Sequence, residues 1–224
     1  MVAGKMYRAP SAQTKRNTKS IKQLQVYSNP ELNFHYGTGS ANITNSGSIS
    51  NLTQISKGTG QTVREGNKIM PRYLQYNFSL QKNMGAGSPN HEVVRLIVFR
   101  AWIKEAVDGV VPGISPSDVL YQVHPLSFLN PDITGKKGDR SRRIQILRNK
   151  MVTLDKQTIT SKTYKFSISM NGPNVANKQP VTYADGANND AISGAIYYLL
   201  VSDNATGSDY ANFGVNYKLS FYDT

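Results

Sequence analysis

One stretch of the chain, residues 92–103 (EVVRLIVFRAWI), constrains the fold more than any other. It is rich in Val, Ile, Phe and Trp, whose side chains suit a pleated strand better than a helix. Apolar residues occupy both faces of such a strand, and only Arg95 and Arg100 interrupt them, one on each face. A strand of this kind needs cover on two sides. We therefore expect a central strand of a β-sandwich, although periodicity alone also admits a helix.

Several further stretches show the pattern of short strands separated by polar turns. Residues 69–81 and 213–221 alternate apolar and polar side chains, as half-buried strands do. The other predicted strands are 32–43, 48–55, 143–154 (with a bulge near Asn149), 164–170, 180–183 and 191–202. A long connection, 104–139, separates two of them and contains an expected helical turn at 117–123. About eight strands without a long helix predict an all-β fold, a single antiparallel jelly roll of two packed sheets.

The net charge of +12 is concentrated in two segments. Residues 1–30 carry six basic residues and no acid, and residues 136–150 carry seven basic residues and one acid. The rest of the chain holds the other 13 of 26 basic residues and 13 of 14 acids, so it is neutral. Such a distribution points to a polyanionic partner. Because residues 1–30 lack hydrophobic periodicity, we expect a disordered, nucleic-acid-binding arm there and a folded domain at 31–224.

The candidate nucleic-acid-binding residues are the cations of the arm. They are Lys5, Arg8, Lys15, Arg16, Lys19 and Lys22. A possible second polyanion patch consists of Lys136, Lys137, Arg140, Arg142 and Arg143. Two tyrosines of the arm, Tyr7 and Tyr27, are further candidates for stacking on the bases of a single strand.

The residues do not assemble into an active site. There is no cysteine, the three histidines are far apart in sequence, and many of the acids fall in turns. The Gly-rich segment 57–68 lacks the Lys-Ser/Thr ending of a phosphate-binding loop. We therefore expect no catalysis, no cofactor and no metal, and leave open a calcium site between Asp203 and Asp209. No apolar run is long enough to span a bilayer, so no membrane partner is expected.

Four motifs, taken in order, resemble those of a family of small icosahedral virus capsid proteins. The family comprises the capsid proteins of satellite tobacco necrosis virus and of circular, Rep-encoding single-stranded DNA viruses. Residues 51–69 resemble its Gly-rich segment ending in R-x-G-x-x-I, and RLIVFRAW (95–102) resembles its Arg-flanked apolar strand. RRIQILRNKMVTL (142–154) and GAIYYLLVSD (194–203) resemble two later strands. Asn149 departs from the pattern, because the family often carries an acid there.

The resemblance implies a jelly roll with strands lettered B to I. On that template residues 69–81 are strand C, 92–103 D, 143–154 E, 164–170 F, 191–202 H and 213–221 I, with B before Lys57 and a short G near 180–183. It also implies a homo-oligomeric shell of roughly sixty copies around a single-stranded genome, for which we favour DNA. The expected location is the virion, and the host nucleus during assembly if the genome is DNA.

Three questions stay open at this point. The second patch is expected to bind either the genome inside the shell or an acidic glycan on the host surface. A non-assembling, single-stranded nucleic-acid-binding β-protein is the alternative function. A carbohydrate-binding jelly roll is weaker, because it leaves the basic arm unexplained.

Overall fold

The computed structural model describes residues 13, 17, 32–103, 114–130, 142–170, 180–183, 191–204 and 210–223. The chain divides into two units, Met1–Glu31 and Leu32–Thr224. In the first unit only Gln13 and Asn17 are described. Both are helical, and Gln13 Nε2 donates a hydrogen bond of 3.2 Å to Asn17 Oδ1. The disorder expected for residues 1–30 therefore stays a prediction.

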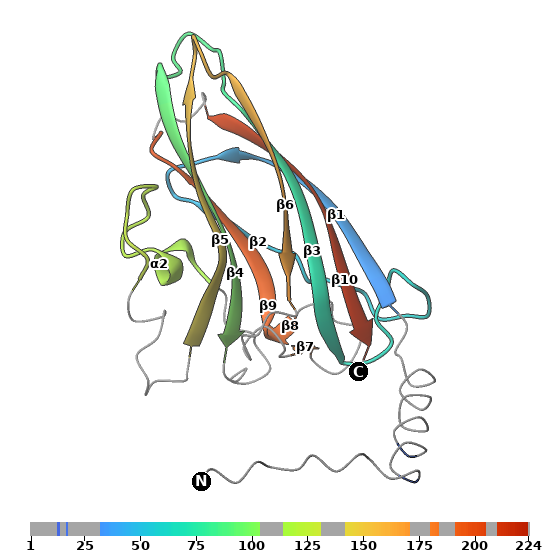
Figure 1. The fold of residues 1–224 in the computed structure, drawn as a ribbon. Coiled ribbons are helices and arrows are strands. Elements are labelled where there is room, and N and C mark those ends of the chain that lie inside the picture. Colours follow the sequence, from blue (N-terminus) through green and yellow to red (C-terminus); the bar gives the residue numbers. More distant parts are fainter. Residues whose placement is uncertain are drawn as a thin grey trace, which may run out of the picture. The chain divides into compact units, whose positions relative to one another are not determined.

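The second unit consists of two packed antiparallel sheets (Figure 1). One sheet has the order β1-β10-β3-β7-β8, with β6 also paired to β3, and the other has the order β2-β9-β4-β5. The strands are β1 (Leu32–Ile43), β2 (Ser48–Asn51), β3 (Lys68–Gln81), β4 (His91–Ile103), β5 (Arg142–Asp155), β6 (Ser161–Ser169), β7 (Val181–Tyr183), β8 (Ala191–Ser193), β9 (Ala195–Ser202) and β10 (Ala211–Asp223). The predicted all-β jelly roll is confirmed.

The strand order corrects the lettering that the resemblance implied. If β1 to β6, β9 and β10 are lettered B to I along the chain, the sheets read B-I-D-G and C-H-E-F. The stretch at 92–103 is thus strand E rather than D, and β3, β5 and β6 also move by one letter. The predicted G near 180–183 is β7, a short addition before strand H. The error arose because 32–43 and 48–55, both predicted as strands, were placed together as strand B, whereas they form β1 and the four-residue β2.

Strand β4 lies between β9 and β5, so the prediction of a central strand is confirmed. Its even-numbered side chains, including Val94, Leu96 and Val98, pack in the main core between the two sheets. Its odd-numbered side chains, including Ile97 and Phe99, pack in a second cluster on the other side of the sheet. Both faces are therefore covered, as the apolar pattern requires.

The second face of β4 is covered by part of the long connection, residues 114–130. This segment contains α2 (Pro116–Val119), and Val119 and Leu120 enter the second cluster. Arg95 fixes the segment to the sheet, because its Nη1 donates hydrogen bonds to the carbonyl oxygens of Pro125 and Ser127. Figure 1 shows α2 and its loop beside β4 and β5.

The helical turn begins earlier than the sequence indicated. Its N-cap is Ser115, whose backbone N–H donates to Asp118 Oδ2 at 2.9 Å, and Pro116 is the first helical residue. Proline is favoured at that position because its missing N–H would have no partner there. A helical turn was predicted at 117–123, whereas α2 begins one residue earlier and already ends at Val119.

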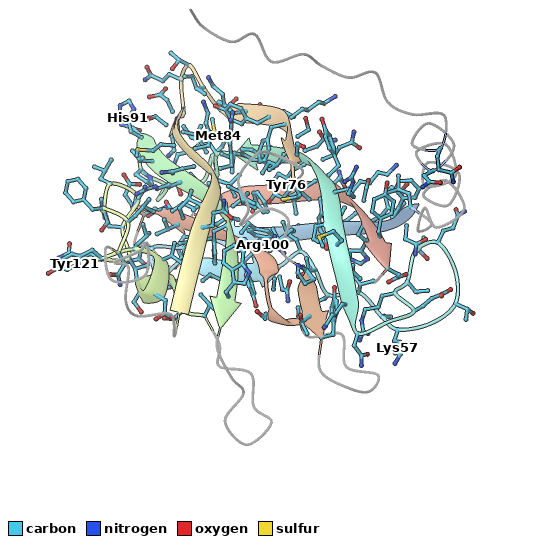
Figure 2. The ribbon with its side chains drawn as sticks, turned by 60° about the horizontal axis from the view of Figure 1, so that its bottom comes forward. Lys57, Tyr76, Met84, His91, Arg100 and Tyr121 are labelled. Carbon is cyan, nitrogen blue, oxygen red and sulfur yellow. The ribbon has the colours of Figure 1, made fainter. Side chains whose placement is uncertain are left out.

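One predicted strand, 191–202, is divided between the two sheets. Gly194 separates β8 from β9 and has φ of +74°, a conformation that glycine adopts at little cost. Arg100 Nε donates to the Gly194 carbonyl at 2.7 Å, and burial lowers the pKa of Arg100 to about 10. Figure 2 shows Arg100 and Tyr76 among the side chains between the sheets. The chain therefore crosses from one sheet to the other at a single glycine.

Gly194→Ala is expected to lower the melting temperature strongly. A Cβ at this position would lie 2.5 Å from the Pro180 carbonyl oxygen, and the left-handed backbone adds about 1–3 kcal/mol of strain. Gly58→Ala is the matched control, since a Cβ there meets its nearest atom, on Val63, at 3.5 Å. Equal melting temperatures for the two variants would contradict the crossing at Gly194.

A buried ion pair closes the end of the sandwich where β3 connects to β4. Lys82 Nζ lies 2.7 Å from Glu92 Oε2, and neither side chain is exposed. Glu92 Oε1 accepts hydrogen bonds from Ser202 Oγ at 2.6 Å and from the Ala211 N–H at 3.3 Å. Because Ser202 ends β9 and Ala211 begins β10, this carboxylate joins the two sheets.

The opposite end, which we call the lower end, contains the starts of β1, β3 and β5 and the ends of β4 and β10 (Figure 1). Leu32 pairs with Tyr222 there, and Ile103 pairs with Arg142. Strands β7 and β8 belong to the same end, because β7 pairs with the first residues of β3.

Candidate nucleic-acid interface

Most of the predicted polyanion-binding residues lie outside the described residues. This holds for all six cations of the arm and for Lys136, Lys137 and Arg140. Arg142 and Arg143 are the first two residues of β5, but only their backbone is described. Their assignment to nucleic-acid binding remains a prediction.

The structure does fix where the two basic segments join the jelly roll. The arm continues into Leu32, at the start of β1, and residues 136–150 run into the start of β5. Both points belong to the lower end. The template had assigned the second patch to a D–E connection, whereas it lies in the connection between strands E and F (β4 and β5). The correction matters because D–E and E–F connections lie at opposite ends of this sandwich.

Two further cations of residues 136–150 pack over aromatic rings. The guanidinium of Arg148 lies 5.5 Å from the ring centre of Phe166, and Lys150 Nζ lies 5.1 Å from that of Tyr164. These pairs bridge β5 and β6, the edge strands of the two sheets. Such contacts stabilise the edge of the core while leaving the cations near solvent.

Two arginines within the motifs have structural roles. Arg64, in the R-x-G-x-x-I pattern, is buried and donates to the carbonyl oxygens of Ile55 and Gly66 at 3.1 and 2.6 Å. Arg95 Nε donates to Asn149 Oδ1 at 2.9 Å. The amide of Asn149 thus supplies the acceptor where the family often carries an acid. The bulge predicted near Asn149 lies in β5 between Arg148 and Ile146.

Within the described residues, no group of three or more His, Cys, Asp or Glu side chains could hold a metal ion. Asp203 Oδ1 accepts a hydrogen bond of 2.9 Å from the Val93 N–H. Asp209 lies outside the described residues, so the calcium alternative is untested. No helix in the described part of the chain is long and apolar enough to cross a membrane.

The described acids include one that caps a turn. The backbone N–H groups of Thr158 and Gln157 donate to Asp155 and, in that order, lower the pKa of its carboxyl group. His91 Nδ1 lies 2.7 Å from Asp155 Oδ2. This arrangement is the turn-capping role that we expected for many of the acids.

A group of aromatic and cationic side chains on the outward face of the six-stranded sheet was not predicted from the sequence. Lys218 Nζ lies 4.0 Å from the ring centre of Phe34 and 5.4 Å from that of Tyr36. The guanidinium of Arg72 lies 5.0 Å from the ring centre of Tyr222. These residues belong to β1, β3 and β10, so only strand pairing brings them together. The alternation of β3 had placed Arg72 inward, but the bulge opposite Ser220/Phe221 turns it outward.

The fold defines an all-β jelly-roll protein with two basic segments joined to one end. No family model matches the chain, and no curated protein matches it. A chain of the solved structure of Desmodium yellow mottle tymovirus is 9% identical, with 98% of this chain and 89% of that chain covered and a TM-score of 0.34. A chain of the Triatoma virus structure is 14% identical, with 100% and 77% covered and a TM-score of 0.26.

Both of these neighbours are viral, but superpositions at such scores carry no argument about function. They also do not test the resemblance to satellite tobacco necrosis virus or to Rep-encoding viruses, which stays a prediction. The fold therefore rests on the strand order alone, and the function is argued from this chain's own residues.

Proposed function

We propose that this chain is a viral capsid (coat) protein that self-assembles into a small icosahedral shell and packages a single-stranded genome. One observation carries the proposal: both basic segments, which hold the whole charge excess, join the jelly roll at its lower end. Jelly rolls serve several functions, so the fold alone does not determine the function of this chain. A neutral sandwich with its cations attached at one end suits a subunit that presents that end to a polyanion.

Subunit contact is supported by exposed apolar side chains on residues 114–130. Tyr121, Leu126 and Phe128 are 70%, 63% and 85% exposed. The Tyr121 N–H donates to the Phe128 carbonyl oxygen at 3.0 Å, and Arg95 holds the segment on the sheet. Exposed apolar side chains on a fixed support are typical of protein–protein contacts, because little ordering entropy is lost on binding. In Figure 2 Tyr121 lies at the margin of the molecule.

The charge of the arm agrees with a packaging role. Six cations in each of roughly sixty copies give about 360 positive charges, enough to neutralise part of a genome on the order of a thousand nucleotides. Within this proposal the protein is located in the virion, and the second patch supplements the arm or binds an acidic glycan. We favour a DNA genome on the resemblance alone, and nuclear assembly depends on that choice.

Electron microscopy of the purified full-length protein tests assembly. Uniform closed particles are expected. Monomers or dimers that still bind single-stranded nucleic acid would favour the alternative, a non-assembling nucleic-acid-binding β-protein.

Deletion of residues 1–30 is expected to leave the jelly roll intact and to reduce the nucleic acid in the particles. The fold should survive because β1 begins at Leu32, after the deleted segment. The ratio of absorbance at the nucleic-acid and protein maxima of purified particles measures the effect. A full-length variant with glutamine at all six arm cations separates loss of charge from loss of length. An unchanged ratio in both variants would contradict a packaging role for the arm.

A further inference from the structure

The outward face of the six-stranded sheet carries no acidic side chain among the residues that the structure describes. The strands of this sheet contain a single acid, Asp223 in β10. Alternation places Asp223 on the same side of β10 as the buried Leu219 and Phe221, and its Oδ2 accepts a hydrogen bond of 2.8 Å from Asn33 Nδ2. A sheet face without acids differs from an ordinary protein surface, where both signs are mixed.

Cations and rings alternate on this face near the lower end. Tyr36 pairs with Lys218, and Phe34 pairs with Ser220, which in turn pairs with Tyr73. Tyr36 is 59% exposed and Tyr73 is 41% exposed, so both rings are available to a partner. We call this group the aromatic face; it consists of Phe34, Tyr36, Arg72, Tyr73, Lys218 and Tyr222.

The rest of the same sheet face consists mainly of amides and hydroxyls, with Leu32 and Met70 as apolar members. The exposed polar members are Thr38, Ser40, Asn42, Gln75, Asn77, Ser79, Gln81, Asn212, Asn216, Ser161, Thr163, Ser167 and Ser169, with two cations, Lys68 and Lys165. Amide side chains both donate and accept hydrogen bonds, so they suit phosphate oxygens and base edges alike. No element of the described residues covers this face, as Figure 1 shows for β1, β10, β3 and β6.

These features together match the chemistry of a single nucleic-acid strand. Exposed rings stack on bases whatever the sequence, and neighbouring cations neutralise the phosphates. A twisted antiparallel sheet with outward aromatic residues is a known platform for such stacking. Cross-strand pairing of rings would also stabilise the sheet, but it does not account for the absence of acids.

We propose that this sheet face binds single-stranded nucleic acid, with Tyr36 and Tyr73 stacking on bases and Lys218 neutralising a phosphate. The inference rests on the nucleic-acid partner in the proposed function, but not on shell assembly. The arm continues from Leu32, in the strand that carries Tyr36. A strand captured by the arm would therefore meet the aromatic face at a high effective concentration.

The test is the affinity of the full-length protein for a fluorescein-labelled, 20-nucleotide oligo-dT, measured by fluorescence anisotropy at fixed salt. The double variant Tyr36→Ser/Tyr73→Ser is expected to bind roughly 10- to 100-fold more weakly, since two stacking contacts are lost. Tyr36→Phe/Tyr73→Phe keeps both rings and should bind like the unmodified protein. Met151→Ser removes an exposed apolar side chain from β5, in the other sheet, and should also bind normally. Lys218→Gln should reduce the salt dependence of binding by about 0.7 in the logarithmic slope.

The outcomes separate this inference from the proposed function. If the unmodified protein does not bind the oligonucleotide, both fail. If it binds and the double serine variant binds equally well, only the inference is overturned. Circular dichroism must first show that the variants are folded. If the serine variants do not fold, photocrosslinking of the unmodified protein to 5-iodouracil DNA decides instead: crosslinks at Tyr36 or Tyr73 support the inference, and crosslinks confined to other segments overturn it.

Discussion

Replacing Val98 by aspartate is expected to abolish the yield of folded protein. Val98 is completely buried in the main core, near the middle of β4, with β5 and β9 paired on either side. A carboxylate there would lie between two sheets, and Arg100, the buried cation on the same face of β4, already donates to the Gly194 carbonyl. The cost of several kcal/mol is comparable to the whole stability of a domain of this kind.

The matched control for this substitution is Thr153→Asp. Thr153 is exposed in β5, the strand next to β4, so the same new charge remains in water. Its melting temperature should stay close to that of the unmodified protein, because surface substitutions usually change stability by less than about 0.5 kcal/mol. Recovery of folded protein in equal amounts from both variants would contradict the central placement of β4. Yield and far-ultraviolet circular dichroism are the measurements.

Lys82→Met is expected to reduce the free energy of unfolding by about 3–5 kcal/mol. The substitution keeps most of the side-chain volume but leaves the Glu92 carboxylate buried, with its hydrogen bonds from Ser202 and Ala211 and without its cation. Urea denaturation followed by circular dichroism measures the change. Lys165→Met, at an exposed position in β6, controls for the loss of one lysine.

A second variant identifies the charge as the cause. In Lys82→Met/Glu92→Gln the buried charge is gone, while the glutamine amide oxygen can still accept hydrogen bonds from Ser202 Oγ and the Ala211 N–H. The double variant should therefore be more stable than Lys82→Met alone. If both have the same stability, the loss comes from packing around Lys82 rather than from an uncompensated carboxylate.

Much of the secondary structure could be predicted from local patterns, because the spacing of apolar residues indicates whether one or both faces of a strand are buried. The two-sided stretch at 92–103 predicted its own central position, and the alternation in β3, β6 and β10 predicted half-buried strands. The bulge near Asn149 was also found, since a slip in alternation is a local signal. The excess of basic residues in two segments could be found by counting the charged residues along the sequence. In these respects local sequence was enough to predict the class of fold, and the charge count supports the expectation of a polyanionic partner.

The strand order could not be obtained in this way, because pairing is a contact between residues far apart in the chain. The four residues of β2 pair with β9, nearly 150 positions later, and without that pairing the letters of β3 to β6 were each displaced by one. The crossing between the sheets at Gly194 could not be predicted either, because apolar residues continue on both sides of the glycine. Only the tertiary structure showed that this run divides between two sheets.

The candidate site could not be predicted in full for the same reason, because it also depends on contacts between strands that are far apart in the chain. The sequence indicated the two basic segments, but only the fold brings their attachment points to one end of the sandwich. Tyr36, Tyr73 and Lys218 are unremarkable as single residues in three separate strands. Their register in β1, β3 and β10 makes them neighbours on a face that has no acid among the described residues. Local sequence determines which side of a strand a residue occupies, whereas the pairing of distant strands decides which residues share a surface.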